Sequence, residues 1–334
     1  MLALIVRRLL QAPLILLAIY TLTLLFAWAI PGNPLENPDG RRPPPEVQAA
    51  MLARYNLDSF PRFYSSYLDN ALGLKWARET FSGRAAATAA QARLEGQAPP
   101  RRRVFDLGPS LSYADWNVND IIRSTLPVSA TLGLLAILMA VVIGVGAGVA
   151  GAVRPNSWLD VGTLSVALVG ISLPSFVVGT AILFAMVWLG WGKVAGEVGF
   201  TQMARAAFTL SLPFAAYVAR LTRMGMIDSL SADYIRTARA KGVGETRVLL
   251  KHALKNAFLP VLSYLGPATA LAMTGSFVVE RVFNIPGMGQ FFVNAVQNKD
   301  LFLIIGVVLI FATMLILFNL AVDVLYRWVD PRIE

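Results

Sequence analysis

This chain of 334 residues contains no cysteine and a single histidine, His252. The absence of cysteine excludes disulfides, thiolate nucleophiles and cysteine-ligated metal sites, and one histidine does not build a metal cluster by itself. Charged residues are also scarce, at 15% of the chain, whereas hydrophobic residues make up 56%. This balance lies outside the range of soluble globular domains and indicates a protein that crosses a membrane several times.

The sequence also lacks the common catalytic motifs. No phosphate-binding loop of the form G-x-x-x-x-G-K-[ST] occurs, so we do not expect this chain to hydrolyse ATP. The motifs H-E-x-x-H and G-x-S-x-G are absent too. The long apolar stretches hold no pair of carboxylates of the kind that proton-coupled carriers often use. These absences argue against a membrane enzyme and a secondary carrier, and they predict that the driving energy enters from outside the membrane.

Six apolar stretches predict transmembrane helices, since a helix needs about 20 apolar residues to cross a bilayer. Five of them contain no Asp, Glu, Lys or Arg: 9–30, 127–153, 161–192, 257–279 and 301–322. The sixth, 206–219, has only 14 uncharged residues and must recruit its neighbours. The first stretch is longer than the apolar core of a signal peptide, which is about 7 to 15 residues, so we interpret it as an uncleaved anchor.

Positive charge is distributed unevenly between the short loops. One side carries Arg7, Arg8, Arg154, Arg220, Arg223, Arg236, Arg239, Lys241, Arg247, Lys251, Lys255, Arg327 and Arg332, and the other carries Lys193, Arg205, Arg281 and Lys299. The positive-inside rule therefore predicts that both termini and the loop 228–256 are cytoplasmic. The net charge of +9 fits loops that face anionic membrane lipid, and we do not expect nucleic acid as a partner.

The predicted spans suggest three segments. Residues 1–30 hold the N-terminal end and the first span, and residues 31–126 form a long outward-facing loop. Within that loop, aromatic residues between 46 and 79 predict a small helical piece on the membrane surface, whereas 82–103 is rich in Ala, Arg, Gln and Gly and predicts a mobile insertion. Residues 127–334 form the core with the other five spans.

Two features inside the spans bear on packing or transport. Gly144 and Gly148 have the small-xxx-small spacing that lets helices approach closely, and we favour a packing role for them. Pro174, followed by Ser175 and Phe176, breaks a backbone hydrogen bond in the third span and predicts a kink. A kink beside a transport path and a kink for packing give the same sequence pattern, so both interpretations stay open.

The basic segment 232–261 separates the fourth and fifth spans. Ser231 is a candidate N-cap, Asp233 suits the first turn of a helix, and Gly242 suits a left-handed stop. A second basic helix is predicted after Gly244, with Arg247, Lys251 and Lys255 beside an apolar arc of Leu249, Leu250, Ala253, Leu254 and Ala257. By pattern alone, this segment could also be a solvated basic loop that faces lipid.

The stretch "DYIRTARAKGVGETRVLLKHALKNAFLPV" closely resembles the cytoplasmic loop of the inner-membrane permease subunits of dipeptide, oligopeptide and nickel importers in the ATP-binding cassette superfamily. The resemblance covers nearly the whole chain, including "RRLLQAPLILLAIYTLTLLFAWAIPGNP", "GISLPSF", "GSFVVERVFNIPGMGQ" and "NLAVDVLYRWVDPRIE". It implies an all-α membrane protein with six transmembrane helices and the fold of binding-protein-dependent importers. The implied location is the cell inner membrane.

The same resemblance implies partners and residue roles. A second, homologous permease subunit, two ATP-binding subunits that carry ATP and Mg, and an extracytoplasmic solute-binding protein are expected, with no cofactor in this chain itself. The implied ATPase-coupling loop comprises Tyr234, Arg236, Thr237, Ala238, Arg239, Ala240, Lys241 and Gly242. We expect Tyr234, Ala238, Ala240, Lys241 and Gly242 to face the ATP-binding subunit. Arg236 and Thr237 depart from the superfamily pattern, because they stand where Glu and Ala are expected.

The implied translocation path and outer gate comprise Pro174, Ser175, Phe176, Glu280, Pro286 and Gly287. Glu280 is expected at the mouth of the path, with an ordinary connecting turn as the alternative. Members of the family import dipeptides, oligopeptides, nickel chelates or oligosaccharides. Peptides are the expected substrate, and the chain should transport nothing without its partners.

Overall fold

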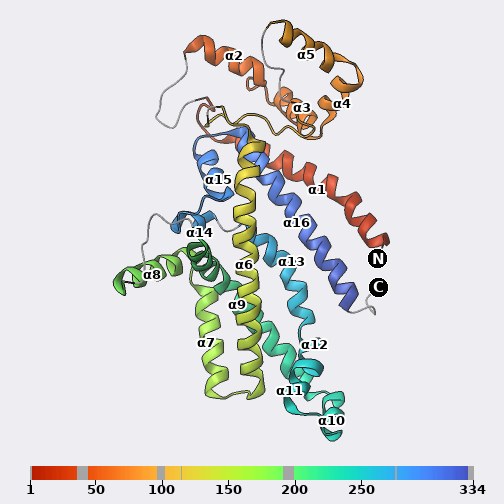
Figure 1. Ribbon diagram of the computed structural model, residues 1–334, viewed down its shortest axis with the longest axis vertical. Helices are drawn as coiled ribbons and strands as arrows, with labels where there is room; N and C mark the ends of the chain where they lie inside the picture. The colour runs from red at the N-terminus through yellow and green to blue at the C-terminus, as the bar shows by residue number, and fades with distance from the viewer. Residues whose placement is uncertain are drawn as a thin grey trace. The chain divides into compact units, whose positions relative to one another are not determined.

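The computed structural model describes residues 2–35, 44–95, 102–113, 115–190, 199–274 and 277–329. Regular structure in these ranges is helical, and the β pairing there is limited to one antiparallel bridge between Pro109 and Asn117. The prediction of an all-α chain is therefore confirmed. The helices are α1 (Leu2–Ala29), α2 (Pro45–Tyr55), α3 (Phe60–Ala71), α4 (Leu74–Phe81), α5 (Arg84–Leu94), α6 (Val118–Val153), α7 (Trp158–Ser172), α8 (Ser175–Trp188), α9 (Phe200–Ser231), α10 (Asp233–Ala240), α11 (Glu245–Arg247), the π-helix η1 (Val248–Ala253), α12 (Leu254–Ala257), α13 (Leu259–Thr274), α14 (Phe277–Val282), α15 (Met288–Gln297) and α16 (Leu301–Val329) (Figure 1).

The chain forms two compact units. Unit 1 comprises Met1–Ile15, Thr125–Gln290 and Phe311–Glu334, and unit 2 comprises Leu16–Ser124 and Phe291–Ile310. The boundary at Thr125 lies inside α6, and the predicted segments 1–30, 31–126 and 127–334 stay a prediction. Unit 2 also takes in the second half of α1 and the start of α16, which the sequence did not indicate.

The described residues include three helices that are long and apolar enough to cross a membrane: Ile5–Ala29 in α1, Val118–Val153 in α6 and Leu301–Leu325 in α16. The predicted span 206–219 lies inside α9, which has 32 residues and is much longer than that apolar stretch. The predicted span 257–279 contains α13, which has only 16 residues. The count of six spans therefore stays a prediction.

The third predicted span, 161–192, is wrong as a single kinked helix. α7 ends at Ser172, α8 begins at Ser175, and the two helices are bent by 107° relative to each other. Leu173, which precedes Pro174, has an extended backbone with φ −85° and ψ 127°. The proline ring disfavours a helical conformation in the residue before it, so the helix stops and a new one starts. The last two residues of this predicted span, 191 and 192, lie outside the described ranges.

The core of unit 1 brings α6, α9 and α13 together around small and branched side chains. Its buried members are Leu132, Ala136, Ile137, Ala140, Ala206, Ala207, Leu210, Phe214, Ala215, Ala268, Ala272, Val279, Phe283 and Ile285. Gly144 and Gly148 of α6 lie directly against α9: a Cβ at Gly144 would lie 2.6 Å from the Ala215 carbonyl oxygen, and one at Gly148 would lie 2.6 Å from that of Ala219. The predicted packing role of these glycines is confirmed.

Two glycines on the same helix give a matched test of this close approach. Gly144→Ala forces α6 and α9 apart, and overpacking of this kind costs about 1–3 kcal/mol. Gly146→Ala meets no atom within 4 Å and raises helix propensity, which stabilises a helix by roughly 0.5–1 kcal/mol. We expect the thermal unfolding midpoint of the detergent-purified chain to fall with the first change and to hold or rise with the second. Equal midpoints for the two variants would contradict the packing role.

Unit 2 is organised around an aromatic cluster. Phe302, near the start of α16, packs against Phe63 at a ring-centroid distance of 5.2 Å and against Tyr67 at 5.8 Å. Tyr67 in turn stacks on Tyr20 of α1 at 5.6 Å. Phe63 and Tyr67 lie on one face of α3 and are almost fully buried. The segment 46–79 therefore is helical as predicted, in α2, α3 and α4. Its position on a membrane surface stays a prediction.

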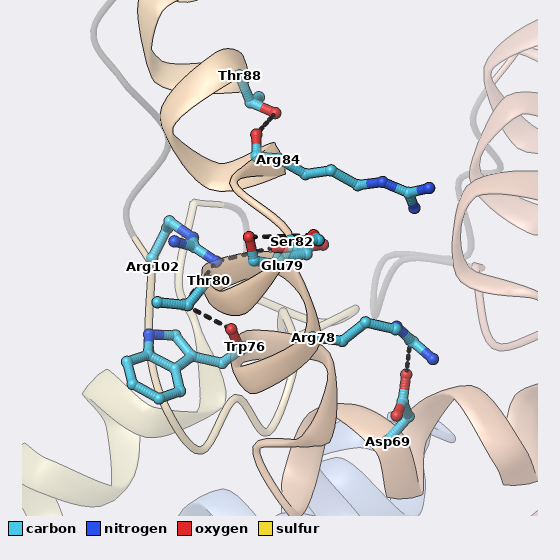
Figure 2. A network of polar contacts seen from close by, with 9 residues as sticks. All are labelled: Asp69, Trp76, Arg78, Glu79, Thr80, Ser82, Arg84, Thr88 and Arg102. Atoms are coloured by element: carbon cyan, nitrogen blue, oxygen red, sulfur yellow. Dashed lines mark hydrogen bonds and ion pairs between the residues drawn. The ribbon is translucent and has the colours of Figure 1, made fainter.

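The segment predicted as a mobile insertion, 82–103, contains helix α5 at Arg84–Leu94. Alanine has the highest helix propensity, which explains a helix with few buried side chains. At the other end of the insertion, Arg102 Nη2 donates to Glu79 Oε2 at 3.2 Å, and before the insertion begins Arg78 of α4 pairs with Asp69 of α3 (Figure 2). Residues 96–101 lie outside the described ranges, and the mobility of the insertion stays a prediction.

Candidate functional site

Helix α10 starts one residue later than the sequence suggested. Its N-cap is Ala232, which offers no capping side chain. The hydroxyl of Ser231, the predicted N-cap, instead donates back to the Asp228 carbonyl oxygen at 2.8 Å. Asp233 does lie in the first turn, where the helix dipole favours a carboxylate.

Gly242 ends α10 as predicted. Its φ of 75° lies in the left-handed region that favours glycine. The Gly242 N–H donates to the Arg239 carbonyl oxygen at 2.9 Å, and the Val243 N–H donates to that of Ala238 at 3.2 Å. These bonds satisfy the last carbonyl groups of α10. The left-handed conformation of Gly242 then turns the chain towards α11.

Ala238 faces the chain itself, which corrects its expected outward orientation. Together with Ile235 it belongs to a buried cluster that also contains Ala152, Met226, Val248, Ala253 and Ala257. The exposed fraction of Ala238 is 9%, and that of Ile235 is 0%. The inner face of α10 is therefore packed on α9 and η1, and its opposite face is exposed.

The second basic helix is not a regular α-helix. After α11, residues Val248–Ala253 form a π-helix, and the α-helical conformation returns in α12. Leu250, expected in the apolar arc, is 58% exposed, because the wider turn rotates it away from the cluster. Gly225 of α9 lets α12 approach closely, since a Cβ there would lie 2.8 Å from the Ala257 carbonyl oxygen.

The remaining predicted coupling residues share the outer surface of this segment. Tyr234, Arg236, Thr237, Arg239, Ala240, Lys241 and Gly242 are all exposed. Asn256 Nδ2 donates to the Tyr234 hydroxyl at 3.0 Å, and Arg239 Nη2 lies 2.6 Å from Glu245 Oε1. The Arg239 guanidinium lowers the pKa of the Glu245 carboxyl through this hydrogen bond. We call these seven residues the outer face of the coupling segment.

A buried ion pair joins α7 to α9 within unit 1. Arg223 Nη2 donates to Asp160 Oδ2 at 2.7 Å, and Arg223 Nε pairs with Oδ1. The Asn156 N–H also donates to Asp160 Oδ2 at 2.8 Å, and the Asp160 side chain is 1% exposed. The sequence showed Arg223 only as one of many positive charges, because its partner lies 63 residues away.

Among the predicted gate residues, Pro174, Ser175 and Phe176 lie at the sharp break between α7 and α8. Phe176 is 49% exposed. Further along α8, Gly179 packs against Phe283, whose ring would lie 3.2 Å from a Cβ at that position. The structure therefore brings α8 next to the turn that follows α14.

Glu280 does not lie at an open mouth, and this expectation is wrong. Its exposed fraction is 0%. The Ser129 hydroxyl donates to Glu280 Oε1 at 2.7 Å, and the Gly289 N–H donates to Oε2 at 2.9 Å. Ser129 Oγ also accepts from the Met288 N–H at 2.8 Å. Glu280 thus ties α6, α14 and the start of α15 together.

The glycines beside Glu280 fit this arrangement. A Cβ at Gly287 would overlap the Glu280 carboxyl group, and one at Gly289 would overlap Phe277. Pro286 is exposed at the tip of the turn. The alternative of a connecting turn thus gains support, because the carboxylate is used to hold that turn. Ser129 gave no sequence signal, since it lies 151 residues before Glu280.

Comparison with known proteins gives matches over the whole chain. The model of the family described as the binding-protein-dependent transport system inner membrane component matches residues 140–334. The oligopeptide transport system permease protein OppB of Haemophilus influenzae is 38% identical over 338 residues, with 100% of both chains covered. OppB of Escherichia coli K12 is 39% identical over 340 residues, again with 100% of both chains covered. The dipeptide transport system permease protein DppB of Bacillus subtilis is 35% identical over 322 residues, which cover 96% of this chain and 94% of the relative.

Proposed function

Because this chain belongs to the inner membrane components of binding-protein-dependent transport systems, we propose that it forms part of the path through which an ATP-driven importer takes up small peptides. The family and the apolar helices make it a multi-pass inner-membrane protein. Its relatives are transport components and not enzymes. The observation that carries the peptide assignment is the full-length identity of 35–39% to permeases named for oligopeptides and dipeptides.

The energy for transport enters through separate subunits. The sequence has no phosphate-binding loop, so ATP and Mg are bound elsewhere. We propose two ATP-binding subunits, a second and homologous permease subunit, and a solute-binding protein that delivers the peptide from outside. Both termini and the coupling segment then face the cytoplasm, as the distribution of Lys and Arg predicts.

The outer face of the coupling segment is the proposed contact with an ATP-binding subunit. Its inner face is fixed by Ile235 and Ala238, and the close approach at Gly225 joins α12 to α9. A displacement of α10 by the bound subunit is therefore transmitted to α9 and α13 through packed side chains. The break between α7 and α8 at Pro174 is the proposed place where the helices around the path change direction.

Reconstitution tests the proposed function. The chain is purified with its partner subunits, placed in proteoliposomes and supplied with loaded binding protein and radiolabelled trialanine. We expect ATP-dependent accumulation of the peptide by the complete complex and none by this chain alone. Accumulation by the chain alone, driven by an ion gradient, would contradict the proposal and favour a secondary carrier.

A further inference from the structure

Helices α7 and α9 of unit 1 lie side by side, and the ion pair between Asp160 and Arg223 joins them at the start of α7 (Figure 1). Each carboxyl oxygen of Asp160 accepts from a different nitrogen of the Arg223 guanidinium. Two bonds of this kind fix the orientation of the two groups as well as their distance. The carboxylate is buried, so its separation from the guanidinium would leave an uncompensated charge. Sliding of α7 along α9 is therefore resisted at this point.

A second contact joins the same two helices at Gly170, near the end of α7. A Cβ at Gly170 would lie 3.5 Å from the Ala216 Cβ and 3.6 Å from the Leu212 carbonyl oxygen, which is ordinary van der Waals contact. The rise of 1.5 Å per residue in a helix separates Asp160 from Gly170 by about 15 Å. Two contacts at this separation resist both sliding and tilting of α7 against α9.

The packed face of α7 is continuous between these two contacts. Its residues are spaced three or four apart, which puts them on one side of the helix: Asp160, Thr163, Ala167 and Gly170. Asp160 and Ala167 are buried, whereas Val166 on another side of the helix is 74% exposed. α7 is therefore attached to the rest of unit 1 along one face.

The ion pair lies close to the coupling segment along α9. Met226 follows Arg223 by about one helical turn and belongs to the buried cluster that holds Ile235 and Ala238 of α10. Ala152 of α6, just before the turn into α7, belongs to the same cluster. A displacement of α10 therefore acts on the part of α9 that carries Arg223.

The other end of α7 leads to the break at Pro174. α7 ends at Ser172, shortly after the contact at Gly170. Leu173 has an extended backbone, and α8 is bent by 107° relative to α7. A helix that is held at two points acts as a rigid element, so a displacement at Asp160 is carried to this break.

We propose that Asp160 and Arg223 are positioning residues that make α7 move together with α9 during transport, so that a displacement of the coupling segment reaches the break at Pro174. The inference rests on the proposed function and adds α7 to the elements that carry the displacement. Coupling between distant sites is carried by packed side chains, polar networks and rigid helices. The buried cluster, the ion pair and α7 supply these three parts in sequence.

A reversible covalent link tests whether α7 and α9 move together. Gly170→Cys with Ala216→Cys places two Cβ atoms 3.5 Å apart, within the range for a disulfide of about 3.5–4.5 Å. The chain has no cysteine of its own, so loss of maleimide labelling reports the bond. We expect the oxidised and reduced forms of one reconstituted sample to take up trialanine at rates no more than about twofold apart. Gly170→Cys alone, oxidised in the same way, controls for effects on the other subunits.

Asp160→Asn tests the role of the ion pair. It keeps the side-chain volume, and the Arg223 side chain is 20% exposed, so its charge can still reach water. We expect the trialanine accumulated per ATP hydrolysed to fall roughly tenfold, which corresponds to the loss of one hydrogen bond between charged groups. This ratio does not depend on how much complex assembles. The disulfide between positions 170 and 216 should restore it, and Asp115→Asn, at an exposed residue of unit 2, should leave it unchanged.

Two results would overturn the inference. A block of uptake by the disulfide, released on reduction, would show that α7 and α9 have to move relative to each other. A parental ratio of peptide to ATP in Asp160→Asn would show that the pair only stabilises the fold. Failure of the proposed function gives a different result, because the parent complex would then accumulate no trialanine at all.

Discussion

Ala240→Asp is expected to lower ATP-dependent peptide uptake at least tenfold while the chain still inserts and accumulates normally. Ala240 is exposed at the end of α10, so the local cost of an aspartate there is small. A carboxylate near a helix C-terminus is disfavoured by only about 0.3–1 kcal/mol. Burial of the same carboxylate without a partner in an interface with an ATP-binding subunit costs several kcal/mol, on the order of 2–7 for polar groups in general. A large effect therefore has to come from the interface.

The control for this prediction is Ala87→Asp, which places the same charge on an exposed alanine of α5 in unit 2. It should leave uptake and stimulated ATP hydrolysis unchanged. Ala238→Asp is unsuitable as a test, because Ala238 is buried in the chain's own cluster and the change would destabilise the fold. If Ala240→Asp complexes assemble and transport like the parent, the outer face of the coupling segment is a solvated surface only.

Glu280→Ala is expected to destabilise the detergent-purified chain by on the order of 3 kcal/mol or more, because it leaves the Ser129 hydroxyl and the Gly289 N–H without their buried acceptor. Glu280→Gln keeps the volume but replaces one acceptor oxygen with a donor, so about 1–3 kcal/mol is expected. Thermal unfolding, followed by circular dichroism, measures both. The order of midpoints should be parent, Gln variant, Ala variant.

Arg281→Gln is the matched control for Glu280, because it changes the next residue, which is exposed. Its unfolding midpoint should equal that of the parent. A Glu280→Gln chain with parental stability and reduced uptake would contradict the structural role of Glu280. It would support the expectation that Glu280 lies at the mouth of the translocation path.

Some local signals in the sequence predicted local structure correctly, although Ser231 is not the N-cap of α10 and the second basic helix contains a π-helix. Gly242 was identified as a left-handed stop because few other residues adopt a positive φ, and the backbone there is as expected. Pro174 was identified as a helix-disrupting residue. Only a kink was expected there, but one helix ends and a second begins in a different direction. The size of a bend depends on what packs on both sides, and the sequence does not report that.

Contacts between distant residues were the main source of error. The family resemblance implied that Glu280 lies at the mouth of the path, but its side chain is buried and accepts hydrogen bonds from the Ser129 hydroxyl and the Gly289 N–H. The family resemblance implied that Ala238 faces an ATP-binding subunit, but its small side chain lets α10 pack on α9 and η1. The Asp160 and Arg223 pair was missed for the same reason. A single sequence carries no direct signal for such pairs.

Site-specific cross-linking tests the central claim most directly, which is that the coupling segment is the contact through which separate subunits drive this permease. The chain has no cysteine, so Lys241→Cys supplies one attachment point for a photoreactive maleimide, and Ala87→Cys supplies the control. Illumination of the purified complex should join the chain to an ATP-binding subunit from position 241 and not from position 87. No adduct from position 241, or equal yields from the two positions, would contradict the account.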